Sequence, residues 1–161
     1  MSSNRLPEKL AAARLRLANK LPYFAQMIYA LVPVESTRLP TMAVDAQWRM
    51  YYALKFVEEH SVQEIAGVIF HELMHLFRAH PRRCRDGNRD WKLWNFATDF
   101  GINDDALKMA EQGYFELPKG LLLPQDFGLQ PNGLEEDYYD LLVQVEKEVR
   151  PEIEKLFREA M

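Results

Sequence analysis

One stretch of this chain, residues 61–81, carries enough local signals to fix its conformation, and it constrains the fold more than any other. Ser61 and Glu64 have the spacing of a capping box, in which each side chain accepts a hydrogen bond from the other residue's backbone N–H. Apolar residues then recur at steps of three and four, and Pro81 closes the pattern. The sequence therefore predicts a long helix over 61–80 that packs one apolar face on a core.

A His-Glu-Leu-Met-His sequence, the HExxH pattern, occupies residues 71–75 in the middle of this predicted helix. Residues four apart in a helix lie about 40° apart around its axis and one turn apart along it, so the imidazoles of His71 and His75 can reach one ion. Both fall outside the apolar arc of the helix, so core burial does not explain them. We predict that His71 and His75 bind zinc; the alternative is two solvated histidines on a helix surface.

Glu72 projects from the same side of the helix as His75, about 60° away around the axis, which suits a general base. Zinc lowers the pKa of a bound water towards about 7, and a neighbouring carboxylate can take the proton before the water attacks a carbonyl carbon. Glu72 would then return the proton to the leaving amine. The pattern favours a zinc-dependent hydrolase, and in particular a metallopeptidase that cleaves a protein or peptide.

A catalytic zinc site of this kind has three protein ligands, so the chain must supply a third. Asp99 and Asn103 lie on the core-facing side of a second predicted helix, 91–111, and a carboxylate there needs a cation as its partner. We predict Asp99 as the third ligand, unless an arginine pairs with it, and Asn103 as a residue that orients the site. By the same helical projection Asp104 points away from the core.

His80 is the rival for the third ligand position. It follows the HExxH pattern by five residues, whereas the metzincin pattern HExxHxxGxxH needs a glycine and a later histidine at places where this chain has Arg78 and Pro81. Cys84 could complete a closed site with His80, although a lone buried cysteine is commoner. The residues alone leave the choice between Asp99 and His80 open.

The remaining pattern predicts an α+β fold, mainly helical with a small sheet. At 161 residues and 48% hydrophobic content the chain can bury one substantial core, and we expect one domain over 1–161. We expect, in order, helices over about 1–30, short strands over 31–52, the HExxH helix over 61–80, a helix over 91–111 and a helical segment over 134–159. Prolines, glycines and charges predict loops at 81–88 and 117–133.

Composition argues against several other functions. A formal charge of −4 does not suit a polyanion-binding molecule, although five arginines between residues 78 and 89 form a local cluster that phosphates could contact. No stretch approaches about 18 consecutive apolar residues, and the start has no apolar core of a secretory signal, so we expect no membrane span. The single cysteine, Cys84, is compatible with a reducing cytoplasm, where we expect the protein to act.

Three runs of residues together resemble a known family. They are PTMAVDAQWRMYYALKFVEEHSVQEIAGVIFHELMHLFRAHPRR, WNFATDFGIND and EEDYYDLL, which follow one another in the family's order within residues 21–142. The chain resembles the bacterial and phage putative metallopeptidase domain that usually precedes a von Willebrand factor A-like domain. The resemblance implies a zincin-like α+β fold with a small mixed or antiparallel sheet on the HExxH helix, zinc as the cofactor, and a partner ATPase of the AAA type.

Individual positions carry this resemblance. The matching residues are His71, Glu72 and His75 for the metal and the base, His80 for a histidine after the active helix, Asp99, Ile102 and Asn103 for a DxxIN signature, and Tyr139 for a late tyrosine. Tyr139 is thereby a candidate to stabilise an oxyanion. The chain departs from the family at Val44, Ala46 and Arg78-Ala79, where the family often has threonine, glycine and a residue followed by glycine.

The resemblance also implies how a substrate would bind. In a zincin-like fold an exposed edge strand receives an extended peptide beside the metal, and the segments Thr41–Val44 and Arg49–Tyr52 are the candidates for that edge. The alternative to an enzyme is a non-catalytic zinc-binding module, related to metallopeptidases, that binds a regulatory partner.

Overall fold

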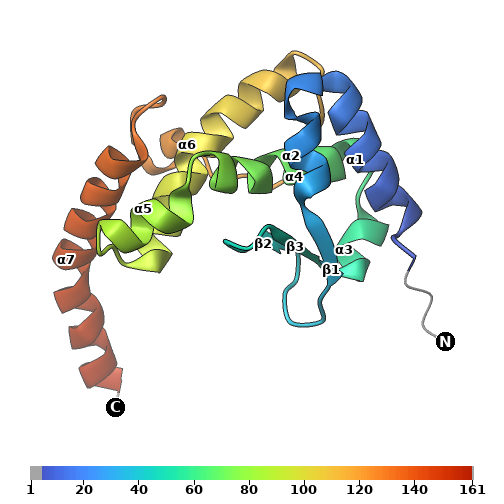
Figure 1. Cartoon of the computed structure of the whole chain (residues 1–161). Helices are drawn as coiled ribbons and strands as arrows, with labels where there is room; N and C mark the ends of the chain where they lie inside the picture. The colour runs from blue at the N-terminus through green and yellow to red at the C-terminus, as the bar shows by residue number, and fades with distance from the viewer. Residues whose placement is uncertain (1–4, 161) are drawn as a thin grey trace.

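A computed structural model describes residues 5–160 of the chain (Figure 1). Its elements are, in order, α1 (Glu8–Lys20), η1 (Pro22–Phe24), α2 (Ala25–Ala30), β1 (Val32–Glu35), β2 (Met42–Val44), β3 (Arg49–Tyr52), α3 (Leu54–Glu59), α4 (Val62–Phe77), α5 (His80–Asp86), α6 (Trp91–Glu111), η2 (Pro124–Phe127) and α7 (Glu135–Ala160). The strands form one mixed sheet within a largely helical structure, which confirms the α+β class. Within the described residues, no helix has the length and apolar content needed to cross a membrane.

The HExxH helix, α4, forms the centre of the fold. Its capping box is confirmed, because the Ser61 hydroxyl accepts from the Glu64 N–H and the Glu64 carboxylate accepts from the Ser61 N–H. Ile65, Ile69 and Leu73 are fully buried, and α4 packs against α1, α6 and β2. Burying such side chains contributes about 1.5–3 kcal/mol each, which fixes the rotation of α4 about its axis.

The sheet has an open edge beside α4. Its order is β1-β3-β2, with β1 parallel and β2 antiparallel to β3. β2 is therefore an edge strand, and it packs against α4. The candidate edge at Arg49–Tyr52 is wrong, because this segment is β3 and lies between the other two strands. Sheet order depends on pairing between distant segments, so the local sequence pattern cannot distinguish a central strand from an edge strand.

The segment after α4 is helical, and the predicted loop at 81–88 is wrong over most of its length. Ala79 adopts the left-handed conformation with φ of 53°, which ends α4 and turns the chain. Pro81 then lies in the first turn of α5, where a proline has no hydrogen bond to lose. The proline thus helps to start a helix, and the turn brings His80 back towards α4.

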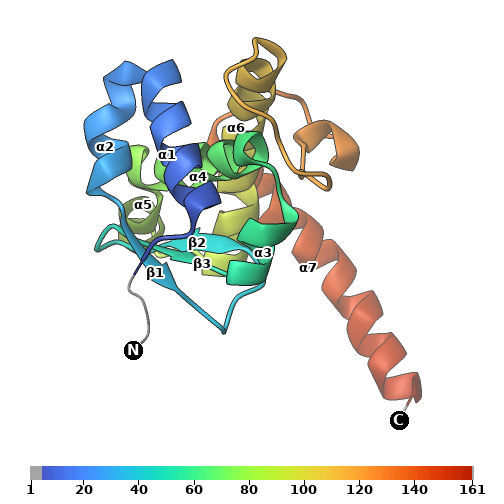
Figure 2. The same ribbon diagram turned by 90° about the vertical axis from the view of Figure 1, so that its right-hand side faces the viewer.

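α7 packs across α6 and then extends away from the rest of the molecule (Figure 2). A second apolar cluster fills the α6–α7 contact, with Ala97 and Phe100 against Tyr138. Asp104 is buried in this region, where its carboxylate accepts hydrogen bonds from the Tyr138 hydroxyl and the Asn132 N–H. The prediction that Asp104 points away from the core is therefore wrong, because α6 packs on two sides and has more than one buried face.

Candidate metal centre

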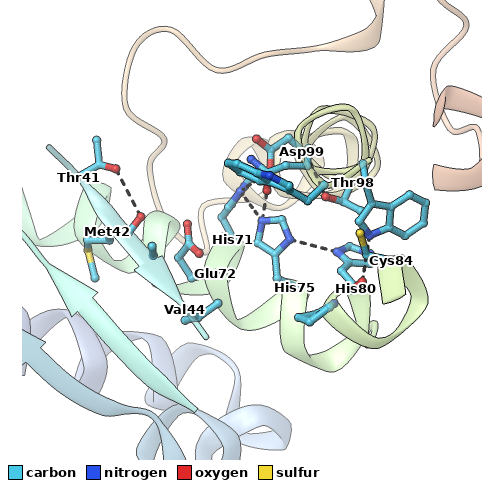
Figure 3. A pocket seen from close by; sticks show the side chains of 15 residues that line it. Thr41, Met42, Val44, His71, Glu72, His75, His80, Cys84, Thr98 and Asp99 are labelled. Carbon is cyan, nitrogen blue, oxygen red and sulfur yellow. Dashed lines mark hydrogen bonds and ion pairs between the residues drawn. The ribbon is translucent and has the colours of Figure 1, made fainter. Parts of the chain in front are cut away.

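Three donor atoms from two helices form a small triangle, as Figure 3 shows. α4 supplies His71 and His75, and α6 supplies Asp99. Asp99 Oδ1 lies 3.1 Å from His71 Nε2 and 3.2 Å from His75 Nε2, and the two nitrogens are 3.2 Å apart. Ligand atoms at about 2.0–2.1 Å from a tetrahedral zinc ion are separated by about 3.3 Å. The three predicted ligands are thus together in a triangle of the size that a zinc ion requires.

Glu72 lies beside this triangle. Its carboxylate and one nitrogen of each histidine fall within 4.8 Å of one another, which is also a group that could hold a metal. Asp99 Oδ1 lies within 3.2 Å of a nitrogen of each histidine, so we take the triangle as the candidate ligand set and Glu72 as the carboxylate beside it. Burial raises the pKa of the Glu72 carboxyl, although the two imidazoles and the backbone N–H of Val44 act against it. A raised pKa suits a carboxylate that must accept a proton.

Asn103 orients His71. The amide Oδ1 accepts a hydrogen bond from His71 Nδ1 at 2.8 Å, and the amide Nδ2 donates to the carbonyl of Leu122 at 2.8 Å. Because the oxygen can only accept, Nδ1 carries a proton and Nε2 is the nitrogen that faces the triangle. Burial lowers the pKa of His71, but the hydrogen bond to Asp99 and the charge of Glu72 outweigh it and raise that pKa to about 9. The site therefore favours a positive charge beside Asp99, which a metal ion would supply.

His75 is supported from its other side by His80. The two Nδ1 atoms are 3.1 Å apart, and His80 Nε2 lies 3.3 Å from Glu135 Oε1. The His80 carbonyl also accepts a hydrogen bond from Trp94 Nε1 at 2.9 Å. Both ring nitrogens of His80 thus have partners outside the triangle. The rival to Asp99 for the third ligand position lies on the far side of His75 from that triangle.

A comparison with models of protein families matches residues 5–155 to a family described as "Putative metallopeptidase domain". The chain belongs to this family. The match includes the triangle, Glu72 and the groups that support the two histidines, and it confirms the resemblance to a putative metallopeptidase domain. Comparisons with curated proteins and with solved structures gave no match.

The two turns at which the sequence departs from the pattern expected of the family differ in backbone strain. In the β2–β3 turn the Asp45 carboxylate accepts hydrogen bonds from two backbone N–H groups, and the positive φ falls on Trp48 rather than on Ala46. Ala46 therefore needs no glycine-like conformation. Ala79 does need one, since its φ of 53° lies in the left-handed region that glycine adopts at no steric cost.

The triangle opens into a cavity of about 600 Å³. Its walls come from β2 and from the beginnings of α5 and α6, and they include Thr41, Met42, Val44, Trp91, Trp94 and Asn95. Among the described residues that line it there is no tyrosine, lysine or arginine. The oxyanion candidate Tyr139 lies elsewhere, with its hydroxyl accepting from the Asp90 N–H at 2.9 Å.

Cys84 lines this cavity but does not complete a site with His80. Its thiol donates to the backbone carbonyl of Arg89 at 3.5 Å, while the ring nitrogens of His80 face His75 and Glu135. Burial raises the pKa of the Cys84 thiol, which disfavours the thiolate form that binds metals.

Two of the clustered arginines form ion pairs with acidic side chains. Arg78 pairs with Asp105 and Glu135, and Arg83 pairs with Glu135 and Glu136. These pairs join the end of α4 and the start of α5 to α6 and α7. The same contacts reduce the cationic charge that the cluster offers to a phosphate.

Glu135 is the residue of this site that sequence reasoning missed. It stands 55 residues after His80, so no local spacing links the two. Its side chain is only 9% exposed, and although burial acts to raise its pKa, hydrogen bonds from His80, Arg78 and Arg83 lower it. The available signal is its position in the EEDYYDLL run, where a carboxylate on the buried face of a helix requires a partner.

Proposed function

We propose that this protein is a zinc-dependent metallopeptidase of zincin-like architecture, with His71, His75 and Asp99 as ligands and Glu72 as general base. The observation that carries the proposal is the triangle of donor atoms, 3.1–3.2 Å on each side, with the Glu72 carboxylate next to it. Membership of a family described as a putative metallopeptidase domain supports the same activity.

The chain's own groups would divide the chemistry among them. Zinc, when bound, lowers the pKa of its water ligand and polarises a carbonyl group. Glu72 accepts the proton of the attacking water at its carboxylate and then delivers it to the leaving amine nitrogen. The contacts of Asn103 and His80 keep both imidazoles turned towards the triangle while this proceeds.

The open edge of β2 is suited to hold an extended peptide beside Glu72. The Asp45 N–H donates to the Arg49 carbonyl and the Ala53 N–H donates to the Thr41 carbonyl, so alternate residues of β2 pair with β3. Met42 and Val44 lie between Thr41 and Asp45, so their backbone groups point to the open edge. The Val44 N–H donates a hydrogen bond to the Glu72 carboxylate. A peptide paired with this edge would lie along the wall that β2 forms in the cavity of the proposed metal site.

Substitution of the base tests this proposal. Glu72→Gln should retain zinc at the wild-type stoichiometry, while the rate of cleavage of an unfolded protein such as casein falls by about 10²–10⁴. Glu111→Gln, at the exposed end of α6, is the matched control and should cleave at the wild-type rate. Equal cleavage by Glu72→Gln and the wild type would rule out the proposed base.

One observation favours a second function, a zinc-binding module that does not catalyse. The cavity has no tyrosine, lysine or arginine among the described residues that line it, so none of these lining residues offers such a side chain to an oxyanion. Under this alternative the wild-type protein would bind zinc and leave casein and peptide libraries intact. An ATPase partner of the AAA type, implied by the family resemblance, and a cytoplasmic location stay predictions.

A further inference from the structure

A chain of three side chains runs from the triangle to the start of α7. His75 of α4 contacts His80 of α5 through their Nδ1 atoms at 3.1 Å, and His80 Nε2 contacts Glu135 Oε1 of α7 at 3.3 Å. Counted over the whole residue, His80 and Glu135 are 2% and 7% exposed. Three helices thus contribute to one buried polar path that ends at a proposed metal ligand.

The protons along this path have only one arrangement that satisfies every group. A neutral histidine that binds a metal through Nε2 carries its proton on Nδ1, so His75 must donate from Nδ1. His80 Nδ1 can accept that hydrogen bond only if the proton of His80 is on Nε2, and this proton then points at Glu135. The carboxylate of Glu135 is the acceptor that completes the path.

Glu135 is held in place on several sides. Arg78 Nη1 donates to Oε1 at 3.0 Å, and Arg83 Nη2 donates to Oε2 at 3.2 Å. On α6, Gly101 leaves room for the side chain, since a Cβ atom built there would lie only 3.0 Å from the Cγ and Oε1 atoms of Glu135. The carboxylate is therefore fixed in position as well as buried.

We propose that His80 and Glu135 are positioning residues of the metal centre, which act through His75 by fixing its ring orientation and its Nδ1 proton. The inference rests on the metal binding of the proposed function, and it does not depend on peptide cleavage. It assigns His80 a role next to a ligand, and it makes the first turn of α7 part of the site.

Two substitutions of His80 test the path while they leave the ion pairs of Glu135 with Arg78 and Arg83 in place. In His80→Gln the amide oxygen can accept from His75 and the amide NH₂ can donate to Glu135, as Asn103 does for His71. His80→Leu has a similar size and no polar atom. We expect Kd for Co²⁺ or Zn²⁺ to rise by about 10–100-fold in His80→Leu and by less than about threefold in His80→Gln.

Two substitutions on α7 provide the second comparison. Glu135→Gln keeps an acceptor for His80 but loses the charge, so we expect Kd to rise by about three- to tenfold. Glu136→Gln also removes a carboxylate from Arg83 but lies off the path, and it should bind metal as the wild type does. Circular dichroism checks that each variant is folded before titration.

The visible absorption spectrum of the Co²⁺-loaded protein gives a readout that a change in stability alone would not move. The bands should shift in His80→Leu and stay at the wild-type positions in His80→Gln and Glu136→Gln, because only the first variant releases the His75 ring. Equal spectra and affinities in all four variants would overturn this inference and leave the proposed function intact. A wild-type protein that binds neither metal would overturn both.

Discussion

The two histidines of the triangle face the same point, yet they are supported in different ways. His71 donates to Asn103, a neutral amide whose other end binds the backbone carbonyl of Leu122 in the long loop before α7. His75 contacts His80, which leads to the charged carboxylate of Glu135. The His71 ring is thus held by a neutral amide that is bonded to a loop carbonyl. The His75 ring is held by a second histidine that is bonded to a carboxylate on a helix.

The difference shows that the candidate metal site is assembled from more of the chain than the HExxH motif. The motif provides two imidazoles and a carboxylate, but the partners that set the ring orientations come from α6, α5 and α7 and from the loop between α6 and α7. Because each imidazole has its own support, substitutions can weaken one at a time.

Removing the carboxylate that both imidazoles share should have the largest effect. Asp99→Asn keeps the size of the side chain but removes its charge, so Kd for Zn²⁺ should rise by more than about 100-fold, beyond the 10–100-fold typical of residues that only orient a ligand. Glu111→Gln, at the exposed end of the same helix, is the control and should retain zinc. A variant at position 99 with wild-type zinc affinity would show that Asp99 is not a ligand, and His80 would return as the candidate.

Removing the hydrogen bond between His71 and Asn103 should have the next largest effect on zinc affinity. Asn103→Leu removes the acceptor of His71 Nδ1, and we expect Kd for Zn²⁺ to rise by about 10–100-fold. Asn103→Asp keeps an acceptor for His71 but places a carboxylate against the Leu122 carbonyl. Its Kd for Zn²⁺ should therefore lie between the values of the wild type and of Asn103→Leu. Isothermal titration with a competing chelator measures all three proteins. If Asn103→Leu bound zinc as tightly as the wild type, the support of His71 would be unimportant.

Substitution of two glycines tests whether the loop after α6 or the start of α7 tolerates an added methyl group better, as measured by the free energy of unfolding. A Cβ on Gly67 of α4 would lie 2.1 Å from the carbonyl oxygen of Glu116, whereas one on Gly101 of α6 would meet only the Glu135 side chain, at 3.0 Å. Backbone yields less readily than a side chain, so Gly67→Ala should lower the free energy of unfolding by about 1–3 kcal/mol and Gly101→Ala by less. Urea unfolding followed by circular dichroism decides between them, and the reverse order would contradict the comparison.

Local sequence patterns predicted the features that depend on neighbouring residues. The capping box of α4 needs only Ser61 and Glu64, and the placement of His71 and His75 on one face follows from helical geometry. The range of α6, Trp91–Glu111, is also the one that its apolar period indicates. The proximity of Asp99 to both histidines could be expected because a core-facing carboxylate needs a positive partner.

The features that sequence reasoning missed depend on contacts between distant segments. The central place of β3 follows from its pairing with β1, and the burial of Asp104 follows from the packing of α7 on α6. The path from His80 to Glu135 joins residues that no spacing rule connects. The helix α5 was missed for a local reason, since a proline is compatible both with a loop and with the first turn of a helix.

The smallest predicted effect concerns the turn that brings His80 to His75. Ala79 has a φ of 53°, and this left-handed conformation destabilises the folded state by about 1–2 kcal/mol for a residue with a Cβ. Glycine avoids this cost, but its greater freedom stabilises the unfolded chain by about 0.4–1 kcal/mol. Ala79→Gly should therefore raise the free energy of unfolding by about 0.5–1 kcal/mol, seen as a Tm higher by a few degrees. Asn88→Gly is the control, because asparagine tolerates its φ of 48° and should gain less. A destabilised Ala79→Gly protein would mean that the Ala79 methyl group makes contacts worth more than the strain, and the turn would then owe its shape to packing.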